Sequence, residues 1–303
     1  MPSPQQLERR TVRGAVWFGT GALDPPSRPC ELKYIVFASE EEVGRAMLAE
    51  LEASARAKAG DLAIVLLGGR GAQAFHRQLG ELARTSRLDP LLARLHVFTQ
   101  DALAPLRMDN AFSFVRDFEW LLGRDFFRKV KSFTPMRTDV EDFEEELKRY
   151  VEKIWSVGGI DLFFLGHGPE PGAASHLAYI KPGAGARAGD WAGIIPISQS
   201  ILEHHIAKFK AGGSPASDED ERECRAVKYI LTLGPAAILN ARRVVQSIVD
   251  ASTAPAKRAS YRRVLETEIA NDPAERAAQL DENPGLWIRL HPNATSFILP
   301  DVL

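Results

Sequence analysis

The sequence has few cysteines and no long apolar run. Its two cysteines, Cys30 and Cys224, lie far apart and form no CxxC pair, so we expect a reducing compartment and neither a disulfide framework nor a structural zinc site. No run of about 18 apolar residues occurs, which predicts that no helix spans a membrane. The N-terminal residues 1–6 are polar and lack the apolar segment of a secretory signal. These absences predict a cytoplasmic protein.

The chain also has no excess of charge of either sign. It contains 38 Lys and Arg residues and 40 Asp and Glu residues, for a net charge of −2. Its overall charge therefore attracts neither nucleic acid nor an anionic membrane surface. Apolar residues make up 45% of the 303, which is enough to bury a sizeable core and excludes a disordered or collagen-like chain. We expect a globular protein with neither a nucleic-acid nor a membrane partner.

Short apolar runs alternate with longer amphipathic stretches along most of the chain. The runs DLAIVLL at 61–67 and IDLFFL at 160–165 predict strands that are buried on both faces of a parallel sheet. The pattern predicts further strands at 32–38, 95–99, 193–197, 229–233 and 244–248, and helices at 40–58, 72–85, 112–130 and 141–157. This alternation predicts an α/β fold: a mostly parallel, Rossmann-like sheet flanked by helices on both faces.

Strand signals continue from residue 31 almost to the end of the chain. Two stretches of weak pattern, 183–190 and 211–221, interrupt them without separating two self-sufficient halves. Because strand signals continue across both stretches, we expect residues 31–303 to form a single α/β domain. Residues 1–30 are expected to form an N-terminal extension.

Three segments that could bind a ligand or take part in catalysis fall at the carboxyl ends of predicted strands. They are Gly68-Gly69-Arg70-Gly71, Asp101 and Gly166-His167-Gly168. Ligands of open parallel sheets bind beyond these strand ends, where the backbone N–H groups of glycine turns can contact anions. We expect the three segments to meet in one crevice. Taken singly, the glycine turn could merely close a strand, and Asp101 could merely cap a helix.

Histidines provide further candidates. His176 lies beside apolar residues, a setting in which a histidine is more often structural than catalytic. His204 and His205 are adjacent, so on a helix their side chains point roughly 100° apart and cannot bind one metal ion together. We therefore expect no metal site.

Five segments, in order, match the motifs of one known family. Residues 67–71 (LGGRG) are similar to a Thr-Gly-Gly-Thr phosphate turn, residues 98–101 (FTQD) to Phe-Asn-Met-Asp, and residues 110–114 (NAFSF) to the Ser-Tyr-Tyr-Ser-Phe start of a helix. Residues 176–182 (HLAYIKP) are similar to His-Ile-Ala-Phe-Asn-Glu-Pro, and residues 289–294 (RLHPNA) to Gln-Leu-His-Pro-Lys-Ala. Over residues 32–299 the chain thus resembles the glucosamine-6-phosphate deaminase/isomerase family, which shares its fold with 6-phosphogluconolactonases and, more distantly, ribose-5-phosphate isomerases.

The resemblance implies acid/base chemistry on a phosphorylated amino sugar. In that family the sugar ring is opened, isomerised and deaminated to fructose 6-phosphate and ammonia, so we expect no cofactor. The resemblance assigns proton transfer between sugar carbons to Asp101, ring opening to His176, and phosphate binding to the turn at 68–71. A carboxylate and an imidazole suit these roles near neutral pH. Family members are often oligomeric, which makes a homo-oligomer an expectation.

The chain departs from the family at the partners of these residues. Lys181 stands where the family has a glutamate that pairs with its histidine, and a cation cannot accept the imidazole N–H. A second family carboxylate is also missing just before His176. Glu170 is the nearest acid and can replace it only if the loop folds back. The family's phosphate-binding lysine and arginine are missing as well, which leaves Arg70, Lys208 and Lys257 as replacements.

The candidate site and three candidate functions follow from these observations. The expected catalytic residues are Asp101, His176 and Glu170, and the expected residues for substrate or phosphate binding are Gly68, Gly69, Arg70, Gly71, Gly166, His167, Gly168, Lys181, Lys208 and Lys257. The first function is that of a sugar-phosphate isomerase or deaminase. The second is a catalytically impaired, regulatory relative that only binds a sugar phosphate, since a site can keep affinity after losing acid/base groups. The third is lactone hydrolysis, as in 6-phosphogluconolactonases.

Overall fold

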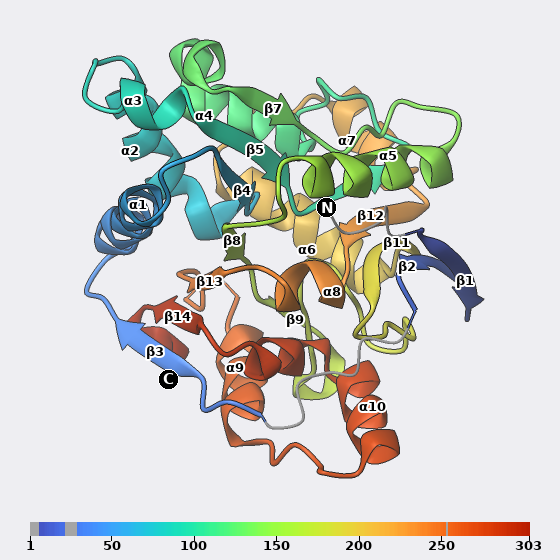
Figure 1. The fold of residues 1–303 in the computed structure, drawn as a ribbon. Coiled ribbons are helices and arrows are strands. Elements are labelled where there is room, and N and C mark those ends of the chain that lie inside the picture. Colours follow the sequence, from blue (N-terminus) through green and yellow to red (C-terminus); the bar gives the residue numbers. More distant parts are fainter. Residues whose placement is uncertain (1–5, 22–28, 253) are drawn as a thin grey trace.

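A seven-stranded parallel sheet forms the centre of the computed structural model, which describes residues 6–21, 29–252 and 254–303 (Figure 1). Its strand order is β3-β14-β13-β8-β4-β5-β7, and every neighbouring pair is parallel. The strands are β3 (Lys33–Val36), β4 (Leu62–Leu66), β5 (Leu95–Thr99), β7 (Ser132–Thr134), β8 (Leu162–Leu165), β13 (Arg243–Ile248) and β14 (Ala294–Ile298). The predicted α/β fold with a mostly parallel sheet is thereby confirmed.

Helices flank this sheet, and short polar side chains fix where several of them begin. Ser39 accepts a hydrogen bond from the Glu42 N–H, and Asp142 accepts one from the Glu145 N–H, as N-cap residues do. The longer helices are α1 (Glu40–Ala57), α2 (Gln73–Ala83), α4 (Phe114–Lys129), α5 (Phe143–Ser156), α6 (Gln199–Ala211), α9 (Ala256–Glu266) and α10 (Pro273–Glu282). Within the described ranges, no helix combines the length and the apolar character that crossing a membrane requires.

Two of the predicted strands belong to a second sheet, which is antiparallel. β11 (Asp190–Pro196) and β12 (Tyr229–Leu233) pair with each other in a sheet of order β1-β2-β11-β12-β6. The strands predicted at 193–197 and 229–233 are therefore real, but they do not join the parallel sheet as expected. Both strands are almost fully buried. A continuous apolar run predicts a buried strand, but it does not show whether that strand pairs in a parallel or an antiparallel sheet.

Part of the expected N-terminal extension forms the edge of this second sheet, at the right of Figure 1. β1 (Glu8–Val12) and β2 (Ala15–Gly19) form a hairpin, and β2 pairs with β11. Trp17 on β2 is fully buried and donates a hydrogen bond to the Ala184 carbonyl at 2.9 Å. Gly193 on β11 makes room for the indole, since a Cβ there would lie 2.5 Å from it. Residues 1–5 and 22–28 of the expected extension lie outside the described residues.

The two sheets meet where β5 passes into β6 (Asp101–Ala104). Gln100, the single residue between these strands, donates its N–H to the Leu66 carbonyl of β4 and accepts from the Leu233 N–H of β12. Asp101 pairs with Thr232 on the second sheet. The carboxyl edge of the parallel sheet is thus closed on one side by the antiparallel sheet, which creates a sheltered place for a site.

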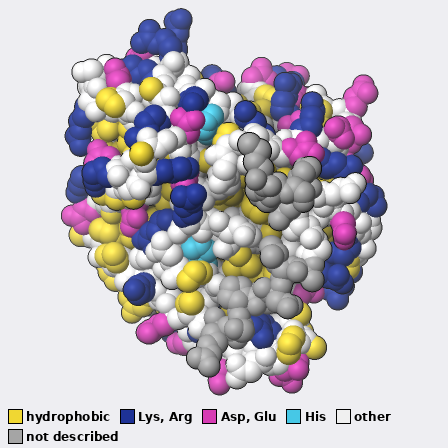
Figure 2. Space-filling model, in the orientation of Figure 1, with side chains coloured by type: hydrophobic (Ala, Val, Ile, Leu, Met, Phe, Trp, Pro, Cys, Tyr) yellow, Lys and Arg dark blue, Asp and Glu magenta, His cyan; other side chains and the backbone are white. Residues whose placement is uncertain are grey.

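The face of the molecule drawn in Figure 2 carries charges of both signs. Figure 2 shows basic and acidic side chains interspersed over the visible face, with no large area of one sign. Three of the exposed large apolar side chains, Tyr34, Ile35 and Val36, lie together on the edge strand β3.

The burial of Trp17 predicts that the hairpin stabilises the whole domain. We expect Trp17→Ala to lower the free energy of unfolding by about 3–5 kcal/mol, because it removes a fully buried ring and its hydrogen bond. Urea denaturation followed by circular dichroism measures this change. Trp120→Ala is the matched control, since Trp120 is 53% exposed, and it should cost less than about 1 kcal/mol. A loss for Trp17→Ala that is as small as the loss for the control would show that the hairpin is dispensable.

Candidate active site

A cavity lies at the carboxyl ends of β4, β5 and β8, where the three predicted segments meet. Of the residues expected from the sequence, Gly68, Gly69, Asp101, Gly166, His167, Gly168, His176 and Lys208 line it. Arg70, Gly71, Glu170, Lys181 and Lys257 do not line it. Asp101 and His176 therefore share one cavity, as the crevice hypothesis requires.

Helix α4 holds the glycine turn that follows β4. Gly69 has φ 71° and ψ −164°, a conformation that is essentially limited to glycine. Burial raises the pKa of the Asp117 carboxyl to about 6, and the backbone of Gly69 opposes this shift. A Cβ on Gly68 would lie 2.1 Å from the ring of Phe114. Phe114 and Asp117 are one turn apart on α4, so one face of this helix fixes both glycines on the cavity wall.

The rest of this turn faces away from the cavity. The Arg70 guanidinium donates to Glu40 Oε1 at 2.7 Å, at the start of α1. The Gly71 carbonyl accepts a hydrogen bond from Ser247 Oγ at 2.5 Å. The positive charge of Arg70 is therefore paired with a carboxylate, and phosphate binding by Arg70 and Gly71 stays a prediction.

Asp101 is a buried carboxyl with an unpaired oxygen. The residue is only 2% exposed, and its Oδ1 atom has no hydrogen-bond partner among the described residues. Burial raises the pKa of Asp101 to about 8, although a hydrogen bond from Gln100 and the charge of Lys208 oppose the shift. A carboxyl with such a pKa holds a proton at neutral pH and exchanges it readily near pH 8, as an acid/base catalyst must.

The loop before His176 folds back, which is the condition for Glu170 to reach the imidazole. β9 (Gly168–Pro169) and β10 (Ser175–His176) pair antiparallel, and the intervening turn places Gly172 and Ala173 at φ 69° and 58°. His176 Nδ1 donates to Glu170 Oε1 at 2.8 Å, and both side chains are buried. This bond leaves Nε2 of the imidazole as the atom that can act on a ligand.

Glu170 also affects the protonation of His176. Burial lowers the pKa of His176, while the hydrogen bond and the charge of Glu170 raise it. Lys181, by contrast, is partly buried outside the cavity wall. Burial lowers the pKa of Lys181, and the charge of Glu170 opposes that shift. Of these two residues, Glu170 is the one that orients the imidazole.

His167 is a neutral imidazole with one ring nitrogen unpaired. Its Nε2 atom shares a hydrogen bond of 2.8 Å with the hydroxyl of Ser260 on α9. Its Nδ1 atom has no partner among the described residues. Burial is the main cause that lowers the pKa of His167 well below its usual value. A ligand hydroxyl can pair with Nδ1 in either tautomer, because a hydroxyl both donates and accepts.

Two of the expected lysines share one carboxylate near the cavity. Lys208 Nζ lies 3.3 Å from Asp250 Oδ2, and Lys257 forms a short ion pair with Asp250 Oδ1. Lys208 lines the cavity, whereas Lys257 is buried behind it. Burial and the charge of Lys208 lower the pKa of Lys257 to about 7. Lys208 is thus the cation that can reach a ligand, while Asp250 and Lys257 position it.

Helix α6 and the segment after β10 contribute residues that the sequence did not single out for the site. His204, His205, Tyr179, Gln100, Phe114 and Phe209 line the cavity. His205 Nε2 donates to the Phe112 carbonyl at 2.8 Å, and its Nδ1 accepts from the Tyr179 hydroxyl at 2.9 Å. His204 Nε2 has no partner within the described ranges. One sequence signal could have pointed to His204 and His205. In the family that the sequence resembles, the phosphate-binding arginine falls at residues 203–205.

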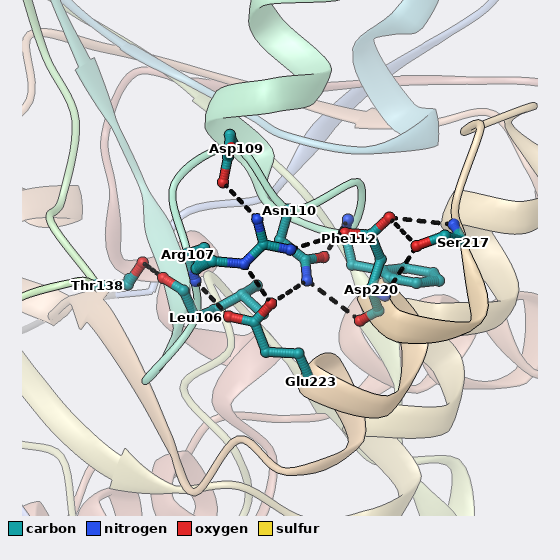
Figure 3. Close-up of polar contacts among 9 residues, drawn as sticks. All are labelled: Leu106, Arg107, Asp109, Asn110, Phe112, Thr138, Ser217, Asp220 and Glu223. Atoms are coloured by element: carbon teal, nitrogen blue, oxygen red, sulfur yellow. Dashed lines mark hydrogen bonds and ion pairs between the residues drawn. The ribbon is translucent and has the colours of Figure 1, made fainter.

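A polar network behind the cavity fixes the position of Phe112 (Figure 3). Arg107 donates to Glu223, with an Nε–Oε2 distance of 2.9 Å, and Asn110 donates to the same carboxylate at 2.8 Å. The Asn110 side-chain oxygen in turn accepts from the Phe112 N–H at 2.8 Å. Because the Phe112 carbonyl accepts from His205, helix α7 (Asp218–Arg225) orients this imidazole indirectly.

Comparison with known proteins reveals similarity of fold. No known protein family and no curated protein sequence matches the chain. A structure described as a monomeric glucosamine-6-phosphate deaminase matches 89% of this chain and 98% of its own, with a TM-score of 0.67 and 20% identity. The chain has the deaminase and lactonase fold. The 6-phosphogluconolactonases of Trypanosoma brucei and Shewanella baltica OS155 match 90% and 89% of it, and 98% and 97% of their own chains. Their TM-scores are both 0.61, at 18% and 14% identity.

The raised pKa of Asp101 predicts that this residue destabilises the protein at neutral pH. In the unfolded chain the Asp101 carboxyl ionises near pH 4, whereas in the folded protein it is buried and ionises near pH 8. The free energy of unfolding therefore falls as the pH rises between these values. We expect Asp101→Asn to raise the free energy of unfolding by about 2 kcal/mol or more at pH 7.5 and to have little effect at pH 4. Urea denaturation at both pH values measures this, with the partly exposed Asp125→Asn as the control. A loss of stability at pH 7.5 would contradict the burial argument.

Proposed function

We propose that the chain is an enzyme that isomerises and deaminates a phosphorylated amino sugar by acid/base catalysis. The supporting observation is that Asp101 and His176 line one cavity, with the imidazole held by Glu170 at 2.8 Å. This contact supplies the carboxylate that the sequence lacks at Lys181. The fold is shared with a structure described as a glucosamine-6-phosphate deaminase, which supports the same reaction class.

In the proposed reaction, the two catalytic groups move different protons. His176 Nε2 exchanges a proton with the ring oxygen of the sugar, and Glu170 stabilises the imidazole when it is protonated. The Asp101 carboxylate carries a proton between adjacent sugar carbons, for which its raised pKa makes it a sufficiently strong base. The backbone of Gly68 and Gly69 and the ammonium of Lys208 bind the phosphate. No cofactor has a part in these steps.

Unpaired polar atoms of residues that line the cavity support a substrate that carries several hydroxyl groups. Gln100 Oε1, Asp101 Oδ1 and His167 Nδ1 are buried and have no hydrogen-bond partner among the described residues. Leaving a buried polar atom unpaired costs roughly 1–3 kcal/mol, so a ligand that pairs with several of them gains affinity. Sugar hydroxyls can do so, because each can donate and accept.

Binding without catalysis and lactone hydrolysis are the second and third candidate functions. Several structures with this fold are described as 6-phosphogluconolactonases, and hydrolysis would use His176 as the base that activates water. The proposal also includes a cytoplasmic location. The family resemblance makes a homo-oligomer expected, whereas the deaminase of this fold is described as monomeric; light scattering measures which state the chain adopts.

The reaction is tested by incubation with glucosamine 6-phosphate and measurement of ammonia and fructose 6-phosphate. We expect turnover by the native chain, a loss of about 10²-fold or more in kcat for His176→Gln, and about tenfold for Glu170→Gln. Glu203→Gln is the control, because Glu203 is an exposed residue of α6 that pairs with Arg225. Turnover of 6-phosphogluconolactone alone would favour the hydrolase. Calorimetric binding of glucosamine 6-phosphate without turnover would favour the regulatory relative.

The pH dependence of the reaction tests the role of Asp101. Because the carboxyl must be ionised to act as a base, we expect kcat/KM to rise about tenfold per pH unit between pH 6 and 7.5 and to level off around pH 8. Initial rates in buffers of constant ionic strength give this profile. Asp101→Asn should abolish turnover, while the Glu203→Gln control should keep the native profile. A flat profile from pH 6 to 8 would argue against Asp101 as the base.

A further inference from the structure

The parallel sheet has an open edge at β3, which the proposed function does not use. β3 pairs with β14 on one side, and the described part of the chain places no strand on its other side. Figure 1 shows β3 at the outer margin of the sheet, at the lower left. An edge strand presents a row of unpaired backbone N–H and C=O groups, with which another strand can pair.

Both faces of β3 are uncovered as well as its edge. Tyr34, Ile35 and Val36 are 45%, 48% and 44% exposed, and successive side chains of a strand point to opposite faces. Proteins usually protect an edge strand with charges, proline or a bulge. β3 has only Lys33, at its start, and its register with β14 is continuous. These exposed hydrophobic side chains are therefore typical of a contact surface.

The pairing with β14 determines which backbone groups of β3 face outward. Phe37, which follows β3, donates its N–H to the Ile298 carbonyl of β14. Backbone groups of successive residues point to opposite sides of a strand, so those of Ile35 also face β14. The N–H and C=O groups of Tyr34 and Val36 consequently face the open edge.

A second copy of the chain can pair with all of these outward groups at once. When two β3 strands run antiparallel about a two-fold axis at Ile35, Tyr34 of each copy lies opposite Val36 of the other, and the two residues exchange both hydrogen bonds. Ile35 then lies opposite Ile35 in a pair without hydrogen bonds, where side chains are closest. Aromatic and β-branched side chains in such cross-strand positions stabilise a sheet.

The charges around β3 favour the same antiparallel arrangement. Lys33 begins the strand, and the first turn of α1, shortly after the strand ends, carries Glu40, Glu41 and Glu42. Antiparallel pairing directs the basic start of each strand toward the acidic turn of the other copy. A parallel neighbour in register would instead bring like charges together.

We propose that the chain forms a two-fold dimer through antiparallel pairing of two β3 strands about Ile35. The seven-stranded sheets of the two copies then form one continuous sheet. The partner is a second copy because one register satisfies the outward groups of both strands, which are identical. This interface goes beyond the proposed function and does not depend on it.

Light scattering after size-exclusion chromatography of the full chain tests the dimer. The concentration series should reach about 100 μM, because a weak dimer dissociates on dilution. We expect the mass of two chains for the native protein and of one chain for Ile35→Glu, which places two carboxylates opposite each other. Trp120→Glu is the matched control and should keep the mass of two chains. Trp120 is 53% exposed and lies on α4, which Figure 1 shows far from β3.

Two further measurements test the position of the two-fold axis. Ile35→Lys alone should give the mass of one chain, and its mixture with Ile35→Glu should restore the mass of two, because opposite charges then face each other. In a Cys30→Ser background, Ile35→Cys should form a disulfide-linked dimer on mild oxidation. The Cα atoms of a cross-strand pair without hydrogen bonds lie about 4.5 Å apart, which a disulfide can span. Tyr34→Cys, whose residue lies opposite Val36, should cross-link far less.

Several outcomes would overturn the proposal. They are a native mass of one chain over the whole series, the mass of two chains in Ile35→Glu, or an equal loss of mass in Trp120→Glu. Failure of the mixture to restore the dimer, or equal cross-linking through Tyr34→Cys, would also contradict it. If Ile35→Glu fails to fold, the Ile35→Cys cross-link still decides. None of these assays needs turnover, so their results are independent of whether the proposed reaction is found.

Discussion

The hydrogen bond between Glu170 and His176 is the contact on which the proposed chemistry of this cavity depends. It exists because the short β9–β10 hairpin turns through Gly172 and Ala173, both in the left-handed region. Ala178 and Tyr179, just beyond His176, also have positive φ values of 48° and 55°. Such conformations cost free energy in residues other than glycine and persist only where their surroundings enforce them. The backbone strain is concentrated on the segment that carries the imidazole.

Much of the parallel sheet could be predicted from the sequence, since its strands are short apolar runs that end in glycine or acid. The turn at 68–71, Asp101 and the segment 166–168 are predicted to meet because the carboxyl ends of parallel strands share one edge, whereas His176 is assigned by the family resemblance. Glu170 could be named only as the nearest acid. Its contact with His176 depends on the path of the five-residue loop 170–174 between β9 and β10, and no spacing rule predicts such a path from the sequence.

The remaining features could not be read from local pattern. The apolar runs of β11 and β12 carry no mark of an antiparallel sheet, and the five-residue β2 strand is too short for a periodic signal. His167 is expected at the site from its position after a predicted strand, whereas the sequence singles out His204 only beside His205, as a pair that cannot bind one metal ion. The partners of the ring nitrogens, such as Ser260 for His167, become visible only in the structure.

Four histidines line the same cavity, and Glu170 distinguishes one of them from the rest. Burial lowers the pKa of His167, His204 and His205, and the charge of Lys208 lowers it further. These three rings are therefore neutral, and they offer hydrogen bonds without exchanging protons. His176 meets the same burial and the same lysine charge, but it alone of the four donates to a carboxylate that favours the protonated ring. Of the four, His176 is therefore the imidazole that the proposed reaction uses for proton exchange, and it lines the same cavity as Asp101.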